Sequence, residues 1–209
     1  LFREMFRFNG RPTPLFTNEM AVQIRQRGGE ADANELLEAF LQPLNANAHE
    51  RYAQLRNGTA TPGDFIVHGG RALLELLTVR GLRIIILSGN PHDQITAEAE
   101  MLGLTGFCNG HVYGHTDANN FTKQAVLEKL MAEESFTGEE FVMFGDGAAE
   151  IEAARNLGGL AIAVCSDENE NGSGRVDENK RSVLLETGAN AVIADYREPE
   201  TLLQILLGE

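Results

Sequence analysis

Cations are scarce in this chain. Its 209 residues include 17 lysines and arginines against 31 aspartates and glutamates, so the formal net charge is -14. A nucleic-acid partner is not expected, because phosphate backbones are bound by basic patches. A solvated acidic surface explains the charge most simply. Any phosphate ligand would need local cations to overcome this field, and a metal ion and a lysine are the obvious candidates.

Cysteine and long apolar runs are also lacking. Cys108 and Cys165 are the two cysteines, and they form no spaced metal motif. Both sit among apolar or small residues, which favours buried free thiols in a reducing, cytoplasmic compartment. No stretch approaches the roughly 18 apolar residues of a membrane span, and no signal peptide is visible. We therefore expect no membrane partner.

The chain is long enough for one good-sized domain or for a core with a small accessory domain. Residues 1–64 are predicted to be helical, with no convincing strand. The predicted helices cover 16–29 and 31–58, the second with a break near Pro43, and a short linker follows at 59–64. We interpret this region as a partial helical cap and residues 65–209 as the core.

From residue 65 onward, apolar strands alternate with amphipathic helices. This alternation predicts an α/β, Rossmann-like parallel sheet covered by helices on both faces. A loop rich in glycine, asparagine and aspartate interrupts the pattern at 167–177. In parallel sheets of this kind, ligands bind at the carboxyl ends of the strands. Strands are predicted at 82–88, 140–146, 160–166 and 190–196, with a short strand or turn region around 107–114. Helices are predicted at 69–81, 91–103, 123–134, 148–159, 178–189 and 200–208.

The first candidate site lies in "IIILSGN", where a predicted strand ends in Ser88, followed by Gly89 and Asn90. A helix is predicted to open at Pro91. A hydroxyl and free backbone N–H groups at such a turn can hold a phosphoryl oxygen. An ordinary helix cap would leave the same pattern.

The second candidate is Lys123, at the start of a predicted helix. It is one of three lysines in the chain, with Lys129 and Lys180. Helix N-termini favour anions, so a cation there makes more sense with an anion between it and the helix end. A solvated surface lysine is the alternative interpretation.

The third candidate is "FVMFGDGAAE", in which Asp146 ends a strand and Glu150 follows one helical turn later. Two acids at i and i+4 around a turn can face one point. Mg²⁺ takes a few carboxylates together with waters and phosphate oxygens. A capping aspartate followed by a surface glutamate is the alternative.

In this order, at successive strand ends, the three features resemble the haloacid dehalogenase superfamily of phosphotransferases. Ser88 matches its second motif and Lys123 its third. "GDGAAE" matches the fourth, usually Gly-Asp-x-x-x-Asp, with Glu150 in place of the second Asp. The resemblance covers residues from about 65 to the end.

The family's first motif is an apolar strand ending in Asp-x-Asp-Gly, whose first Asp is the nucleophile. This chain contains no Asp-x-Asp, its first 31 residues contain no Asp, and it begins at Leu1 without an initiator methionine. We therefore expect an N-terminal truncation that has removed the nucleophile. The resemblance implies that the missing strand lies between the 84–88 and 141–146 strands, whose edges would be unpaired or would close on each other.

The resemblance implies a phosphatase of small phosphorylated metabolites that works through an aspartyl-phosphate intermediate. Asp146 and Glu150 would belong to a Mg²⁺ site, with Glu150 positioning a metal-bound water or Lys123. Lys123 and Ser88 would stabilise the phosphoryl group, which Gly89 and Asn90 would also bind. The present chain is expected to be inactive.

Other functions stay open. A non-catalytic module that binds a phosphate ligand, and a phosphomutase of the same superfamily, would carry the same three features. A nucleotide-binding Rossmann domain ranks low, because no Gly-x-Gly-x-x-Gly follows a strand. The substrate and the oligomeric state do not follow from the sequence.

Overall fold

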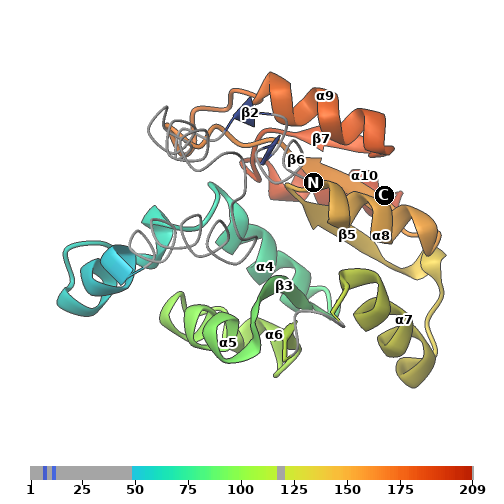
Figure 1. The fold of residues 1–209 in the computed structure, drawn as a ribbon, viewed down its shortest axis with the longest axis horizontal. Helices are drawn as coiled ribbons and strands as arrows, with labels where there is room; N and C mark the ends of the chain where they lie inside the picture. Colours follow the sequence, from blue (N-terminus) through green and yellow to red (C-terminus); the bar gives the residue numbers. More distant parts are fainter. Residues whose placement is uncertain (1–6, 9–10, 13–48, 117–120, 209) are drawn as a thin grey trace, which may run out of the picture. The chain divides into compact units, whose positions relative to one another are not determined.

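The structure is a computed structural model that describes residues 7–8, 11–12, 49–116 and 121–208 (Figure 1). The chain divides into two compact units, Leu1–Thr61 and Pro62–Glu209. The division falls three residues before the boundary predicted at 64/65. The helix predicted at 16–29 lies outside the described residues, as does most of the helix predicted at 31–58.

The first unit contains a short antiparallel pair that the sequence interpretation did not expect. Strand β1 (Arg7–Phe8) pairs with β2 (Arg11–Pro12), so the prediction of no strand in residues 1–64 was wrong. The signal was present, because the sequence places Asn9-Gly10 between the two arms, and Asn-Gly is the strongest short-range indication of a hairpin. Residues 49–57 are helical, in agreement with the end of the predicted second helix.

The second unit contains two parallel sheets. Strand β3 (Ile86–Pro91) pairs with β4 (Val112–His115). Strands β5 (Val142–Gly145), β6 (Leu160–Val164) and β7 (Ala191–Ile193) form the other sheet in the order β5-β6-β7. The predicted α/β class with parallel strands is confirmed. Strands β3 and β5 do not pair with each other, and among the described residues each keeps one unpaired edge.

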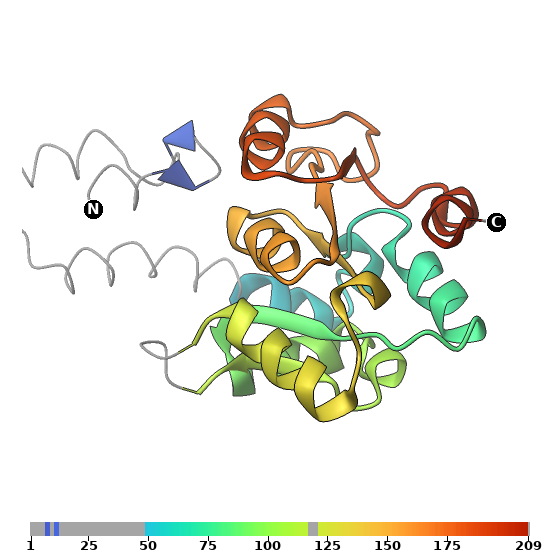
Figure 2. The ribbon, with the colours of Figure 1, turned by 90° about the vertical axis from the view of Figure 1, so that its right-hand side faces the viewer.

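Helices cover these sheets (Figure 1). Helix α5 packs on β3 and β4, whereas α8 and α9 pack on the three-stranded sheet. Helix α10 lies beside α4 (Figure 2). The helices of this unit are α4 (Gly70–Val79), α5 (His92–Met101), α6 (Thr105–Cys108), α7 (Lys123–Glu134), α8 (Ala148–Asn156), α9 (Glu178–Thr187) and α10 (Pro199–Leu207), with 3-10 turns at Pro62–Asp64 and Gly138–Glu140.

Each sheet has its own hydrophobic core. The core of the three-stranded sheet brings Ile151 and Ala154 of α8 onto β6, where small alanines allow the helix to lie close. Leu184 of α9 is also part of this core. Cys165 in this core and Cys108 in the other are free and buried, as predicted. Burial raises the pKa of the Cys165 thiol to about 11, so this thiol stays protonated at neutral pH.

In the part of the chain that the structure describes, no helix combines the length and the apolar character needed to cross a bilayer.

Candidate functional site

The Gly145–Asp146–Gly147 turn wraps around the side chain of Glu150. Strand β5 ends at Gly145, and Gly147 is the N-cap residue of α8. A Cβ on Gly145 would collide with the Cβ and Cγ of Glu150, and one on Gly147 would lie 2.7 Å from Glu150 Oε2. Gly145 is therefore required by the Glu150 side chain, which folds back beneath the turn, whereas at Gly147 the clash involves only the end of that side chain. Asp146 stays exposed above it.

Glu150 forms an ion pair with Lys123. The Lys123 ammonium donates to Glu150 Oε1, and the two side chains are only 16% and 12% exposed. Lys123 is the first residue of α7, and Thr122 caps that helix by accepting from the Ala125 N–H at 3.0 Å. A helix N-terminus disfavours a cation such as the Lys123 ammonium. The Glu150 carboxylate offsets this effect by placing a negative charge next to the ammonium. Burial lowers the pKa of Lys123, and the charge of Asp146 opposes that shift.

The donor set at this turn fits a divalent cation that brings other ligands with it. Among the described residues there is no cluster of three or more His, Cys, Asp or Glu side chains able to form a protein cage. Mg²⁺ needs no such cage, because it commonly binds one or two carboxylates together with waters and phosphate oxygens. The exposed Asp146 carboxylate can provide one such ligand. The Glu150 carboxylate is engaged by Lys123.

The Ser88 turn differs from its prediction. Strand β3 does not end at Ser88 but continues to Pro91, with an irregular register between Leu87 and Pro91. The reason is the partner strand: Gly114 has no Cβ, which would lie 2.5 Å from the Asn90 carbonyl oxygen, so the two strands stay close. The Ser88 hydroxyl accepts from the Asn90 N–H at 3.1 Å. It does not cap α5, whose N-cap residue is Pro91.

The structure therefore brings the predicted residues together in two groups. Lys123 and Glu150 are in contact, and Asp146 lies close enough for its charge to act on the lysine. The second group, 88–90, lies within β3 of the other sheet, and Gly89 and Asn90 are exposed. Helix α7 connects the groups, since it packs against both β3 and α8.

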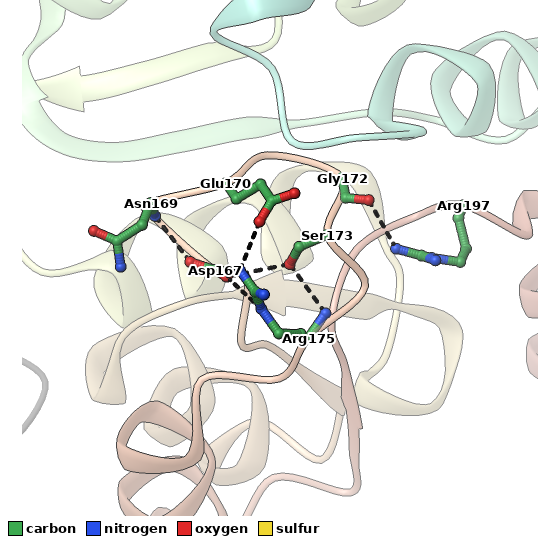
Figure 3. Close-up of polar contacts among 7 residues, drawn as sticks. All are labelled: Asp167, Asn169, Glu170, Gly172, Ser173, Arg175 and Arg197. Atoms are coloured by element: carbon green, nitrogen blue, oxygen red, sulfur yellow. Dashed lines mark hydrogen bonds and ion pairs between the residues drawn. The ribbon is translucent and has the colours of Figure 1, made fainter.

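The loop at 167–177 is more ordered than its composition suggested (Figure 3). Asp167 Oδ2 accepts from Arg175 Nε at 3.0 Å and from Nη2 at 2.8 Å, and from the Ser173 hydroxyl at 3.2 Å. Its other oxygen accepts from the Asn169 N–H at 2.9 Å. Chiefly the Arg175 hydrogen bonds hold the pKa of Asp167 at about 2. Asp and Asn next to glycines in a loop are the sequence signal for such side-chain turns.

Tyr196 is a neighbour of the site that the sequence interpretation missed. Its ring meets that of Phe144 edge-on, with centroids 5.6 Å apart. Burial raises the pKa of its hydroxyl, and the negative charge of Asp146 raises it further. The sequence only indicated a strand end here, because the approach of Tyr196 to β5 depends on tertiary packing.

Comparisons with known proteins agree with this architecture. The family model of haloacid dehalogenase-like hydrolases matches residues 3–158. A phosphoserine phosphatase from Campylobacter jejuni subsp. doylei is 28% identical over 151 residues, which are 67% of this chain and 70% of that protein.

Two crystal structures show the same fold. A HAD family hydrolase from Deinococcus radiodurans, with bound phosphate and sodium, aligns with 93% of this chain and 77% of its own at a TM-score of 0.61 and 15% identity. A predicted phosphatase from Clostridium acetobutylicum aligns at a TM-score of 0.53 and 21% identity, over 66% of this chain. The match spans only 59% of that Clostridium protein. The chain belongs to the haloacid dehalogenase-like hydrolase family.

Proposed function

We propose that this chain carries the phosphoryl-binding centre of a Mg²⁺-dependent phosphatase that acts on a small phosphorylated metabolite. The observation that carries the proposal is the partly buried Lys123–Glu150 ion pair beside the exposed Asp146. A shielded cation next to a free carboxylate can receive a phosphoryl oxygen on one side and a metal ion on the other. The relationship to a phosphoserine phosphatase supports the same class of substrate.

Each residue has a role in the proposal. Asp146 would hold Mg²⁺, which when bound neutralises charge on the phosphoryl oxygens. Lys123 would stabilise the same charge, and Glu150 would hold the lysine in place or position a metal-bound water. The Ser88 hydroxyl, which accepts from the Asn90 N–H and keeps its own proton to donate, would bind a phosphoryl oxygen together with the Gly89 N–H and the exposed Asn90 side chain.

Hydrolysis by the family's route needs two further carboxyl groups. A nucleophilic aspartate oxygen bonds to phosphorus while the ester oxygen leaves, and a second Asp gives that oxygen a proton. Water then attacks the aspartyl-phosphate and releases phosphate. The chain has no Asp-x-Asp pair, so we propose that it binds phosphate without turnover. Residues 1–64 would form part of a cap domain.

A single substitution tests the metal assignment. In the full chain, Asp146→Asn should weaken binding of Mg²⁺ in the presence of phosphate by about tenfold or more, since a charged ligand is lost. Isothermal titration calorimetry measures this Mg²⁺ affinity. Glu152→Gln is the matched control, because Glu152 is an exposed acid on α8 and its loss should leave Mg²⁺ affinity unchanged. Equal affinities for wild type and Asp146→Asn would refute the assignment.

A non-catalytic phosphate-binding protein is the second candidate, and one observation favours it. The family match begins at residue 3, so it includes Phe6-Arg7-Phe8-Asn9-Gly10, which has the spacing of Asp-x-Asp-Gly. Arg7 and Asn9 stand where that motif has its two aspartates. A guanidinium stays protonated and cannot attack phosphorus, and an amide cannot exchange the proton. On this interpretation the first motif is altered within the chain instead of lost upstream of it.

A gain of function separates these two candidates. If residues 7–10 are the altered motif, the double variant Arg7→Asp/Asn9→Asp should acquire Mg²⁺-dependent hydrolysis of p-nitrophenyl phosphate that the wild-type chain lacks. The same double variant with Asp146→Asn is the control and should be inactive. No activity in the double variant, together with an Asp-x-Asp-Gly segment in the coding sequence upstream of Leu1, would favour the truncated enzyme.

A further inference from the structure

Strand β3 bulges away from β4 at its carboxyl end. In their parallel register, Leu87 pairs with Tyr113. The next pair is Pro91 with His115, so residues 88–90 of β3 lie opposite a single residue of β4. Bulges re-aim side chains and are common next to active sites. Since neighbouring strands lie about 4.8 Å apart, the backbone of His115 is next to the end of this bulge.

The side chain of His115 lies on the face of the sheet that α7 covers. Successive side chains of a strand point to opposite faces, and a Cβ on Gly114 would lie 2.8 Å from two atoms of α5. Tyr113 lies on the other face, where its hydroxyl is 3.1 Å from His111 Nδ1. His111 Nδ1 in turn lies 3.9 Å from Oε1 of Glu134, the last residue of α7. His115 continues this row toward the first residue of α7.

A ring contact places His115 at the start of α7. Its imidazole meets the ring of Phe121 edge-on, with centroids 6.1 Å apart. Phe121 comes two residues before Lys123, the first residue of α7. His115 is therefore next to both the bulge that carries Ser88 and the segment that leads to Lys123.

Packing accounts for the ring of His115 but not for its nitrogens. The residue is half-buried, and among the described residues its imidazole makes the contact with Phe121 and no hydrogen bond. A phenylalanine would make the same ring contact, whereas polar ring atoms at a half-buried position favour a partner. An imidazole can donate from a ring nitrogen in its neutral and in its protonated form. His115 therefore offers a donor at this edge of the sheet.

The proposed anion site has little positive charge of its own. Glu150 pairs with Lys123, and Asp146 adds a further negative charge. A phosphoryl group bound between Lys123 and the Ser88 turn is thus favoured by each additional donor, because hydrogen bonds to an anion are stronger than neutral ones.

We propose that His115 is a further binding residue for the phosphoryl group. Its imidazole donates a hydrogen bond to an oxygen of the anion that Lys123 and the Ser88 hydroxyl also bind. The inference rests on the proposed function, because it takes that anion site as its starting point. Loss of this charge-assisted hydrogen bond should weaken anion binding about tenfold or more.

The test compares substitutions of His115 in the full chain. His115→Phe keeps the ring contact with Phe121 and removes both nitrogens, whereas His115→Asn and His115→Gln keep an N–H donor and remove the ring. The affinity for inorganic phosphate is measured by calorimetry at a fixed Mg²⁺ concentration. We expect it to fall about tenfold or more in His115→Phe and less in at least one of the two amide variants. A residue that only packs on Phe121 would give the reverse order, which would overturn the proposal, as would an unchanged affinity in His115→Phe.

His92→Phe is the matched control. It removes another half-buried imidazole close to the same bulge, but His92 is the first residue of α5, on the other face of the sheet. Its phosphate affinity should stay unchanged, and a loss equal to that of His115→Phe would contradict the proposal. If His115→Phe lowers the urea midpoint of unfolding, the amide variants are compared with His115→Ala, and at least one of them should bind phosphate more tightly.

Two further variants separate this inference from the proposed function. Phosphate binding that neither Asp146→Asn nor Ser88→Ala weakens refutes the proposed function itself. Binding that either of these substitutions weakens, but that His115→Phe leaves unchanged, refutes this inference alone.

Discussion

At the scale of single residues, the carboxylate of Glu150 has an unusual environment. It is enclosed by the Gly145–Gly147 turn and bonded to the ammonium of Lys123. Breaking such a pair by removing one partner leaves an uncompensated charge, which is more damaging than losing an exposed pair. Glu150 therefore contributes to stability as well as to the position of the lysine.

We expect Glu150→Gln to lower the free energy of unfolding by about 2 kcal/mol or more. The loss should shrink at high pH, because burial lowers the pKa of Lys123 and the unpaired lysine becomes neutral as the pH rises through that value. Urea unfolding at two pH values measures both effects. The control is Glu133→Gln, which breaks the exposed pair between Lys129 and Glu133 and should cost at most about 1 kcal/mol. Similar losses for the two variants would contradict the assigned burial.

At the scale of elements, the loop between β6 and α9 is held by charge. Asp167 accepts two hydrogen bonds from Arg175, which also pairs with Glu170 at 2.7 Å. An antiparallel bridge between Ser166 and Val176 closes the base of the loop. The loop order thus depends on an ionised Asp167.

Asp167→Asn should loosen this loop. Because the folded pKa of Asp167 is about 2 and its ordinary value is 3.8, its stabilising effect is complete above pH about 4 and is lost as the pH falls toward 2. At neutral pH, trypsin should cleave the variant after Arg175 faster than the wild type. Between pH 4 and 2, the melting temperature of the variant should fall less than that of the wild type. Glu170→Gln, which removes the outer and more exposed partner, should change cleavage little. Equal cleavage of wild type and Asp167→Asn would contradict the account.

Elements with local signals were predictable from the sequence. Helix α7 has the predicted bounds, 123–134, because Thr122 provides an N-cap within its own sequence. The end of β3 was misplaced by three residues, because it depends on how Gly114 of β4 meets Asn90. The network around Asp167 was also missed, since its partners are chosen by three-dimensional geometry.

At the scale of the whole molecule, the family and the order of the candidate residues could be predicted because the strand-end motifs are local in sequence. The resemblance also implied that Glu150 positions a metal-bound water or Lys123, and the Glu150 and Lys123 side chains are in contact. The packing of Tyr196 against Phe144 could not be predicted, because it joins elements far apart in the chain. The roles of Ser88, Lys123, Asp146 and Glu150, and of residues 1–64 as a cap, stay predictions. The absence of the nucleophilic Asp also stays a prediction.

The most direct test of the central claim is a crystal structure of the full chain grown with Mg²⁺ and tungstate, a phosphate mimic that is easily located. We predict the anion within hydrogen-bond distance of Lys123 Nζ and the Ser88 hydroxyl, with a metal ion bound by Asp146. An anion bound elsewhere, with the site around Lys123 and Asp146 empty, would contradict the account.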